Sequence, residues 1–140
     1  MQDGEQVSAD APERSVEQPA TKAGASFPRA ARLLKHSDFE RVYKQGRRHF
    51  SSHMTVFFLP QAAGNARVGF TVGRVLGGAV QRNRIKRRLR EAVRLTRSTL
   101  KGTVDVVINP KKSILTLDFA VVLEEVSRAF NVITRKLAEK

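Results

Sequence analysis

The sequence predicts an α+β domain in which helices cover a small sheet, with the elements in the order helix, strand, strand, helix, strand, helix. Three observations support this order: two segments with strand-like alternation, a long amphipathic helix pattern over residues 79–100, and a short apolar run at 104–108. Residues 1–25 have no periodicity and are rich in Gln, Ala, Ser, Glu and Pro. We therefore expect a disordered acidic extension over residues 1–25 and a single folded domain over residues 26–140.

The first helix is expected to begin at Ser37 and to stop at Gly46. Ser37 and Glu40 have the spacing of a capping box, in which each side chain bonds the backbone N–H of the other residue. Glycine is common directly after the last turn of a helix. Between these ends, Phe39 and Tyr43 are four residues apart, so the helix presents both rings on one side.

Two strands are expected next, at residues 52–59 and 67–73. The first strand alternates between two sets of side chains, Met54, Val56 and Phe58 on one face and Thr55, Phe57 and Leu59 on the other. In the second strand Gly69, Thr71 and Gly73 leave one face almost without side chains, so that face cannot be the core face. Residues 47–50 allow one more short strand.

The helix predicted over residues 79–100 has an apolar stripe and a cationic opposite side. At 100° per residue, the stripe contains Ile85, Leu89, Ala92, Val93, Thr96 and Leu100. The opposite side carries Arg87, Arg90, Arg94 and Arg97, flanked by Arg84 and Lys86. Glu91 is the only acid between Gln81 and Arg97, so charge pairing within the helix is scarce and the cations repel one another unless a polyanion binds.

The last strand and the last helix follow Gly102. The strand at residues 104–108 is almost wholly apolar, as expected for a buried position, and Asn109 and Pro110 are expected to close it. Thr116 is expected to cap the last helix. In that helix apolar residues recur at alternating spacings of four and three, at Phe119, Leu123, Val126, Phe130, Ile133 and Leu137.

The charge balance favours nucleic acid as the partner. The chain has 26 Lys and Arg residues against 13 Asp and Glu residues, a formal net charge of +13. Residues 1–25 contain five acids and two bases, a charge of −3, so the remaining residues carry +16. Phosphates attract such a concentration of positive charge regardless of base sequence. A membrane is less favoured, because no run is long and apolar enough to span a bilayer and the basic helix lacks an interfacial Trp or Phe.

Other functions find little support in the sequence. Without cysteine there are no disulfides or thiolate metal sites, and His36, His49 and His53 lack metal-binding spacing. The glycines near residues 73–78 fit neither a P-loop nor a dinucleotide-binding pattern. The N-terminus lacks a signal pattern, so a cytoplasmic protein is the expectation.

An aromatic groove is a second candidate binding feature. If the first helix brings Phe39 and Tyr43 over the face that Phe57 shares with the glycine-rich strand, the three rings would wall a groove with a floor of bare backbone. Such a groove suits an extended single strand whose bases stack on rings. In the alternative, the rings form a small satellite core under the helix, and the sequence alone does not choose between the two.

Several motifs resemble those of the protein component of bacterial ribonuclease P. The opening motifs are Phe27-Pro28, Arg32-Leu33-Leu34-Lys35, Ser37-Asp38-Phe39 and Val42-Tyr43 through Gly46. The signature motifs are Arg67-Val68-Gly69-Phe70-Thr71-Val72, Gly77, Ala79-Val80 and the highly specific run Arg82-Asn83-Arg84-Ile85-Lys86-Arg87. The resemblance covers about residues 27–138.

This resemblance implies a two-layer α/β sandwich with a small mixed sheet, similar to the second domain of the fifth small-subunit ribosomal protein. The basic helix would make a left-handed crossover between parallel strands, against the usual right-handed rule. The resemblance further implies an accessory subunit without a bound cofactor. In this family an RNA subunit cleaves precursor tRNA with divalent metal ions such as magnesium.

The resemblance also assigns two sets of residues. The positions that would contact the catalytic RNA are Arg82, Asn83, Arg84, Lys86, Arg87, Arg90 and Arg94. The positions that would hold the single-stranded 5′ leader of precursor tRNA are Arg32, Phe39, Tyr43, Thr55, Phe57, Thr71 and Arg74. The chain departs from the family pattern at Val75 and Gly78, where basic or polar residues are usual, and at Asn109-Pro110-Lys111-Lys112.

Two other classes are compatible with the charge. A ribosome-associated protein or a general RNA chaperone would bind RNA without depending on a 5′ leader. A DNA-binding protein could place the basic helix in a major groove, but the sequence around that helix lacks a helix–turn–helix pattern.

Overall fold

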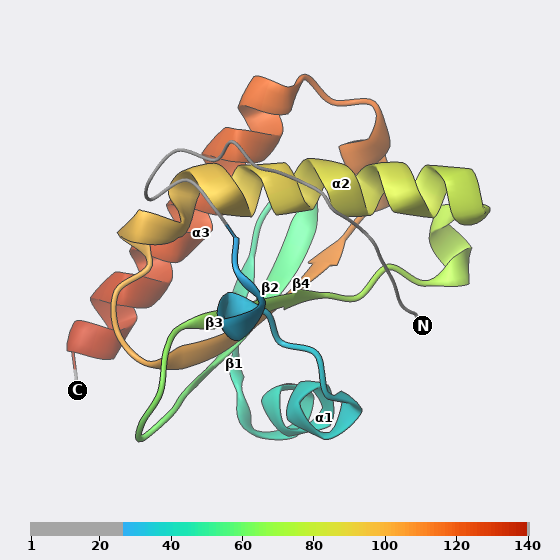
Figure 1. Cartoon of the computed structure of the whole chain (residues 1–140). Coiled ribbons are helices and arrows are strands. Elements are labelled where there is room, and N and C mark those ends of the chain that lie inside the picture. Colours follow the sequence, from blue (N-terminus) through green and yellow to red (C-terminus); the bar gives the residue numbers. More distant parts are fainter. Residues whose placement is uncertain (1–26, 140) are drawn as a thin grey trace.

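The computed structural model describes residues 27–139, which form three α-helices and a four-stranded sheet. In chain order the elements are α1 (His36–Gln45), β1 (Arg47–Phe50), β2 (Met54–Pro60), β3 (Arg67–Phe70), α2 (Ala79–Thr96), β4 (Val104–Pro110) and α3 (Phe119–Ala138) (Figure 1). Short 3₁₀ turns lie before α1, on both sides of α2 and before α3. The predicted order is confirmed, and the extra short strand is present at β1.

The sheet has the strand order β1-β2-β4-β3 and mixes two kinds of pairing. β2 pairs antiparallel with β1 and with β4, whereas β3 pairs parallel with β4. Parallel neighbours need a long connection, and α2 supplies it between β3 and β4. The predicted mixed α+β fold is therefore confirmed, and the hand of the crossover stays a prediction.

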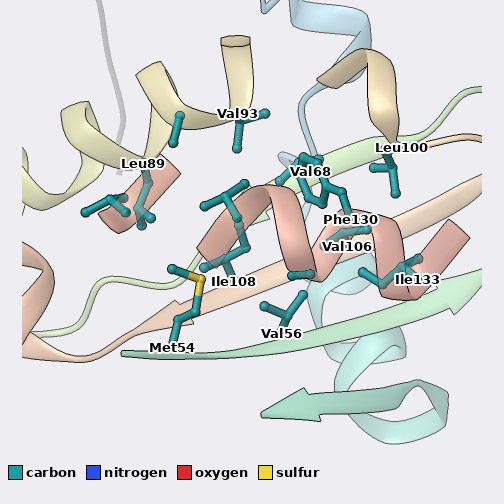
Figure 2. Packing of buried hydrophobic residues seen from close by; sticks show 14 of the residues in the cluster. Met54, Val56, Val68, Leu89, Val93, Leu100, Val106, Ile108, Phe130 and Ile133 are labelled. Atoms are coloured by element: carbon teal, nitrogen blue, oxygen red, sulfur yellow. The ribbon is translucent and has the colours of Figure 1, made fainter. Parts of the chain in front are cut away.

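The main core lies between one face of the sheet and the two long helices, α2 and α3, which cross over that face (Figure 1). Figure 2 shows Met54, Val56, Val106 and Ile108 of the sheet and Phe130 and Ile133 of α3, which all belong to this core. The predicted stripe of α2 is buried here as well, at Ile85, Leu89, Ala92, Val93 and Thr96, with Leu100 just beyond the helix. Apolar periodicity alone therefore fixed which side of α2 faces the sheet.

The opposite face of the sheet is partly covered by α1, which lies apart from the two long helices (Figure 1). A second cluster lies under it, built on buried Leu33, Val42 and Val107. Half-buried Phe39, Tyr43, Phe57 and Leu59 pack against these residues. We call these four residues and the three they pack against the α1 cluster.

The start of α1 differs from the prediction, whereas its end agrees. Lys35 is the N-cap, its carbonyl accepts from the amides of Asp38 and Phe39 at 3.1 and 3.2 Å, and no side chain caps the helix. The predicted capping box at Ser37 is wrong, because Ser37 already lies inside the first turn. Gly46 follows the last turn as expected, but with an extended φ of −80°. A Cβ there would lie 2.4 Å from Val42 O and 2.8 Å from Phe58 O, so glycine is required by crowding.

Two further boundaries differ. β3 ends at Phe70, short of the predicted Gly73, and β4 continues to Pro110 because Asn109 pairs with Thr55 in register. The predicted cap of the last helix, Thr116, is also wrong. Its amide bonds the carbonyl of the preceding 3₁₀ turn, and Asp118 is the N-cap of α3.

A chain of ion pairs connects α1 to the sheet. Asp105 of β4 is only 1% exposed, and Arg67 of β3 donates to both of its carboxylate oxygens at 2.9 and 2.8 Å. Arg67 also lies 3.4 Å from Asp38, which Arg41 contacts at 2.7 Å. The hydrogen bonds to Asp105 raise the pKa of Arg67. These pairs hold the first turn of α1 at the sheet edge.

Candidate nucleic-acid interface

The outer side of α2 presents cations that the fold does not neutralise. Burial of the apolar stripe against the sheet turns the opposite side of the helix outward. Arg84 and Arg87 are exposed there, and no carboxylate among residues 27–139 lies within ion-pair distance of either. Asn83 is exposed on the same side. The structure thus brings these three predicted RNA-binding residues to one accessible surface.

Other arginines of α2 have partners within the protein. Arg94 donates to both oxygens of Glu91, at 3.1 Å through Nε, and this contact lowers the pKa of Glu91 and raises that of Arg94. Arg82 Nε donates to Gly77 O at 3.1 Å, which stabilises the turn before the helix. Arg88 donates to Leu117 O, in the segment just before α3. Arg82 and Arg94 of the predicted set therefore have structural contacts as well.

Arg32 lies with the basic helix rather than with the aromatic rings. It bridges Val68 at the edge of β3, and its guanidinium donates to Phe27 O at 3.1 and 3.0 Å and lies over the Phe27 ring at 5.4 Å. Desolvation lowers the pKa of Arg90 of α2, and the positive charges of Arg32 and Arg87 lower it further. Arg32 therefore extends the positive surface of α2 along the sheet edge.

On the other face, Tyr43, Phe57 and Thr71 come together as the resemblance implied. The rings of Tyr43 and Phe57 meet edge to face, with centroids 4.9 Å apart. The Tyr43 hydroxyl donates to Asn109 Oδ1 at 2.8 Å and lies 2.5 Å from Thr71 Oγ1. Because a phenol has one proton, Thr71 is the donor in the second contact. Burial raises the pKa of Tyr43, and the two hydrogen bonds oppose that rise.

The predicted floor of bare backbone is wrong at Gly69. This glycine is buried, and a Cβ on it would lie 2.6 Å from Phe39 Cζ and 3.0 Å from Leu33 Cβ. The missing side chain therefore makes room for the Phe39 ring. Phe39, Tyr43 and Phe57 do form the satellite core that was the alternative, although each ring stays half-buried. A role for them in RNA binding remains a prediction.

Beyond the rings, one line of residues crosses the sheet on the same face as α1. Pairing in register places Phe50 beside Thr55 and Thr55 beside Asn109, and the Tyr43 hydroxyl joins Asn109 to Thr71. We call these four residues the sheet row, Phe50, Thr55, Asn109 and Thr71. Of the residues predicted to hold the 5′ leader, Thr55 thus lies in the row. Arg74 lies exposed in the 3₁₀ turn Arg74–Leu76, and in the described part of the chain it makes no hydrogen bond to the row or to the rings.

Sequence reasoning missed three residues of this face. Asn109 was assigned to the end of a strand, although continued alternation from Val107 would have placed it here. Arg48 lies with its guanidinium 5.4 Å from the centroid of the Phe57 ring, and Phe50 is 67% exposed. Alternation along β1 indicates both once its pairing with β2 is known.

Neither a metal site nor a membrane span is found in the described residues. Within residues 27–139, no group of three or more His, Asp or Glu side chains could hold a metal ion. None of the helices there combines the length and the apolar character needed to cross a bilayer.

A mixed sheet with a cationic helix on one face and a line of polar and aromatic side chains on the other is the arrangement expected of an RNA-binding α+β protein. A family model described as Ribonuclease P matches residues 27–134. The chain therefore belongs to the family of ribonuclease P protein components, and the resemblance drawn from its motifs is confirmed.

Relatives and solved structures agree with this assignment. The ribonuclease P protein component of Desulforapulum autotrophicum is 36% identical over 110 residues, covering 79% of this chain and 94% of the relative. That of Oleidesulfovibrio alaskensis is 43% identical over 99 residues, covering 66% of this chain and 79% of the relative. The ribonuclease P protein of Thermotoga maritima has 29% identity and a TM-score of 0.64, covering 74% of this chain and 96% of that one. This chain is thus the protein subunit of a ribonucleoprotein that processes tRNA.

Proposed function

We propose that this subunit binds the catalytic RNA of ribonuclease P through the outer side of α2, and the 5′ leader of precursor tRNA through the α1 face of the sheet. The RNA subunit would cleave the precursor with its own bound magnesium ions. The observation that carries the proposal is the exposed pair Arg84 and Arg87, which has no ion-pair partner among the described residues. Cations left in this state lower the stability of the free protein and favour binding of a polyanion.

The α2 surface suits a folded RNA. Asn83, Arg84 and Arg87 are exposed along successive turns of one rigid helix, so they meet phosphates at a fixed spacing. Desolvation and the positive charges of Arg32 and Arg87 lower the pKa of Arg90, and a phosphate bound near Arg90 would offset this repulsion. We assign Lys86, Arg82 and Arg94 to the same surface, where each would supplement its contacts within the protein with RNA contacts.

The α1 face suits an extended single strand. The sheet row offers hydroxyl and amide groups, and Tyr43 and Phe57 leave parts of their rings exposed beside it. Phe39 would support these rings from below, and Arg74 would supply charge next to the row. Contacts here would add affinity for precursor over mature tRNA, because only the precursor carries a leader.

The two surfaces together explain why a protein would assist an RNA catalyst. Two RNAs that approach each other repel through their phosphates, and magnesium ions screen that repulsion. Protein cations near both RNAs supply part of the screening, so less magnesium is needed.

Reconstitution tests the proposal directly. We expect the protein, added to a bacterial ribonuclease P RNA at low magnesium, to restore 5′ processing of precursor tRNA. Changing Arg84 and Arg87 together to Ala should weaken assembly with the RNA and reduce the slope of log K against log[salt] by about 1.4 to 1.8, since each phosphate contact releases roughly 0.7 to 0.9 counterions.

Arg128→Ala is the matched control, because Arg128 is also exposed but lies on α3 and pairs with Glu124 at 3.0 Å. For Arg128→Ala, the slope of log K against log[salt] should stay at the wild-type value. An unchanged slope in the α2 variant would contradict phosphate binding by this helix. The second candidate is a general RNA-binding protein. Such a protein would add the same affinity for precursor tRNA as for mature tRNA.

A further inference from the structure

The sheet row ends in an aromatic side chain that no sequence motif indicated. Phe50 lies on β1, the edge strand, and its pairing with Thr55 places it on the α1 face of the sheet. Its side chain is 67% exposed, whereas Phe39, Tyr43 and Phe57 are half-buried. A ring that is exposed on a sheet surface, unlike a buried one, has a face available for stacking on a ligand.

The other rings of this face are less open to a flat ligand. Phe57 has the Arg48 guanidinium over its ring at 5.4 Å and the Tyr43 ring against it at an interplanar angle of 88°. Phe39 lies against Gly69. Phe50, by contrast, has neither a ring nor a cation stacked on it among the residues that the structure describes. It is therefore the ring of this face with the most open surface.

The charges near Phe50 identify the kind of partner. Arg48 lies two residues away on the same face of β1, and exposed Lys111 follows β4, where its amide donates to His53 O at 2.9 Å beside the β1–β2 turn. Open aromatic rings with neighbouring cations match the two parts of a single-stranded nucleic acid, its bases and its phosphates. A folded protein partner would not require both an open aromatic ring and neighbouring cations.

We infer that Phe50 is a stacking platform for one base of the 5′ leader, and that the leader lies along the sheet row from Thr71 to Phe50. The choice of the leader as the strand rests on the proposed function. The row runs from β1 over β2 and β4 to Thr71, which directly follows β3, so it covers three strand spacings of about 4.8 Å each, or roughly 14 Å. Thr55 and Asn109 would meet the strand between its two ends, and Phe50 would favour a purine at one leader position because larger bases stack more strongly.

The test compares Phe50→Leu with Phe50→Tyr in the reconstituted holoenzyme. Leu keeps apolar character without the ring, and Tyr keeps the ring. We expect Phe50→Leu to weaken precursor tRNA binding about five-fold or more, Phe50→Tyr to stay within about two-fold of wild type, and mature tRNA to bind all three alike. Because Phe50 is exposed, both variants should melt at the wild-type temperature.

A leader scan locates the base. Abasic substitutions are placed one at a time along the leader, and one of them should abolish the difference between wild type and Phe50→Leu. Equal precursor binding by wild type and Phe50→Leu would overturn the inference, as would an equal loss for precursor and mature tRNA. If wild type itself binds precursor no better than mature tRNA, the proposed leader site fails instead, so the two failures are distinguishable.

Discussion

Gly46 and Gly73 both have extended backbones, with φ values of −80° and −89°, but their surroundings differ. A Cβ on Gly46 would be pressed against two backbone oxygens, whereas a Cβ on Gly73 would meet nothing within 4 Å. These oxygens belong to Val42 of α1 and Phe58 of β2 and have little freedom to move, so the substitution requires α1 and β2 to separate.

We therefore expect Gly46→Ala to lower the free energy of unfolding by about 2 kcal/mol or more, the usual cost of overpacking a rigid site. Gly73→Ala is the matched control and should leave stability unchanged or raise it by a few tenths of a kcal/mol, through the unfolded chain. Urea denaturation of both variants measures this. Equal effects at the two positions would show that the contact between α1 and β2 relaxes freely.

His49 lies on the face of β1 opposite Phe50, and its Nε2 atom is buried without a hydrogen-bond partner. Burial lowers the pKa of His49, the positive charges of Lys136 and Arg128 lower it further, and Glu125 opposes them. In the unfolded chain the pKa of this imidazole is near 6.5, so the unfolded state binds a proton more readily than the folded protein does. This contribution to stability is present above about pH 6.5 and is lost as the pH falls through the lower folded value.

The pH dependence can be assigned by substitution. His49→Leu should lose less stability than wild type between pH 7.5 and pH 5, by a fraction of the limiting slope of about 1.4 kcal/mol per pH unit, since solvent screens part of the ring. Denaturation at both pH values gives the comparison, and identical profiles for wild type and His49→Leu would contradict it.

At the scale of elements, α1 is joined to the sheet both by apolar packing and by the ion pairs of Arg67. Arg67→Met would leave the Asp105 carboxylate buried without its partner, at a cost of about 2 to 4 kcal/mol of unfolding free energy. Arg41→Met should cost less than about 1 kcal/mol, because Asp38 keeps its contact with Arg67. Thermal or urea unfolding of the single variants tests the ranking.

A double variant separates the buried charge from general packing. In Arg67→Met with Asp105→Leu, no buried carboxylate is left without a partner, so the protein should be more stable than Arg67→Met alone. A double variant less stable than the single one would mean that the loss comes from packing rather than from charge.

Helix periodicity predicted the elements well because it depends on many residues at once. The stripe of α2 runs from Ile85 to Thr96, so a misjudgement at one position would not have changed the result. Caps depend on one or two residues, and the tertiary structure decided them: Lys35 rather than Ser37 caps α1, and Asp118 rather than Thr116 caps α3. Sequence patterns therefore predicted where the helices lie better than the residues at which they begin and end.

The candidate site was predicted in part, for a related reason. The side of a strand on which a residue lies follows from its pairing partner, and partners distant in sequence are not visible in the sequence. Asn109 and Phe50 joined the face of Thr55 only through the register of β2 with β4 and β1. The resemblance grouped Arg32 with the rings, but its bridge to Val68 directs it to the other side of the sheet.

For the molecule as a whole, the position of β4 has a consequence for synthesis on the ribosome. β1 and β2 form a local hairpin that can pair as soon as it emerges. Among the described residues, however, β4 is the only strand that pairs with β3, and it follows β3 by more than thirty residues. Until Pro110 has left the ribosome, α2 has no complete sheet on which to bury its stripe. The nascent chain therefore exposes a basic, half-apolar helix beside ribosomal RNA before its domain can close, and folding must wait until β4 is free to pair.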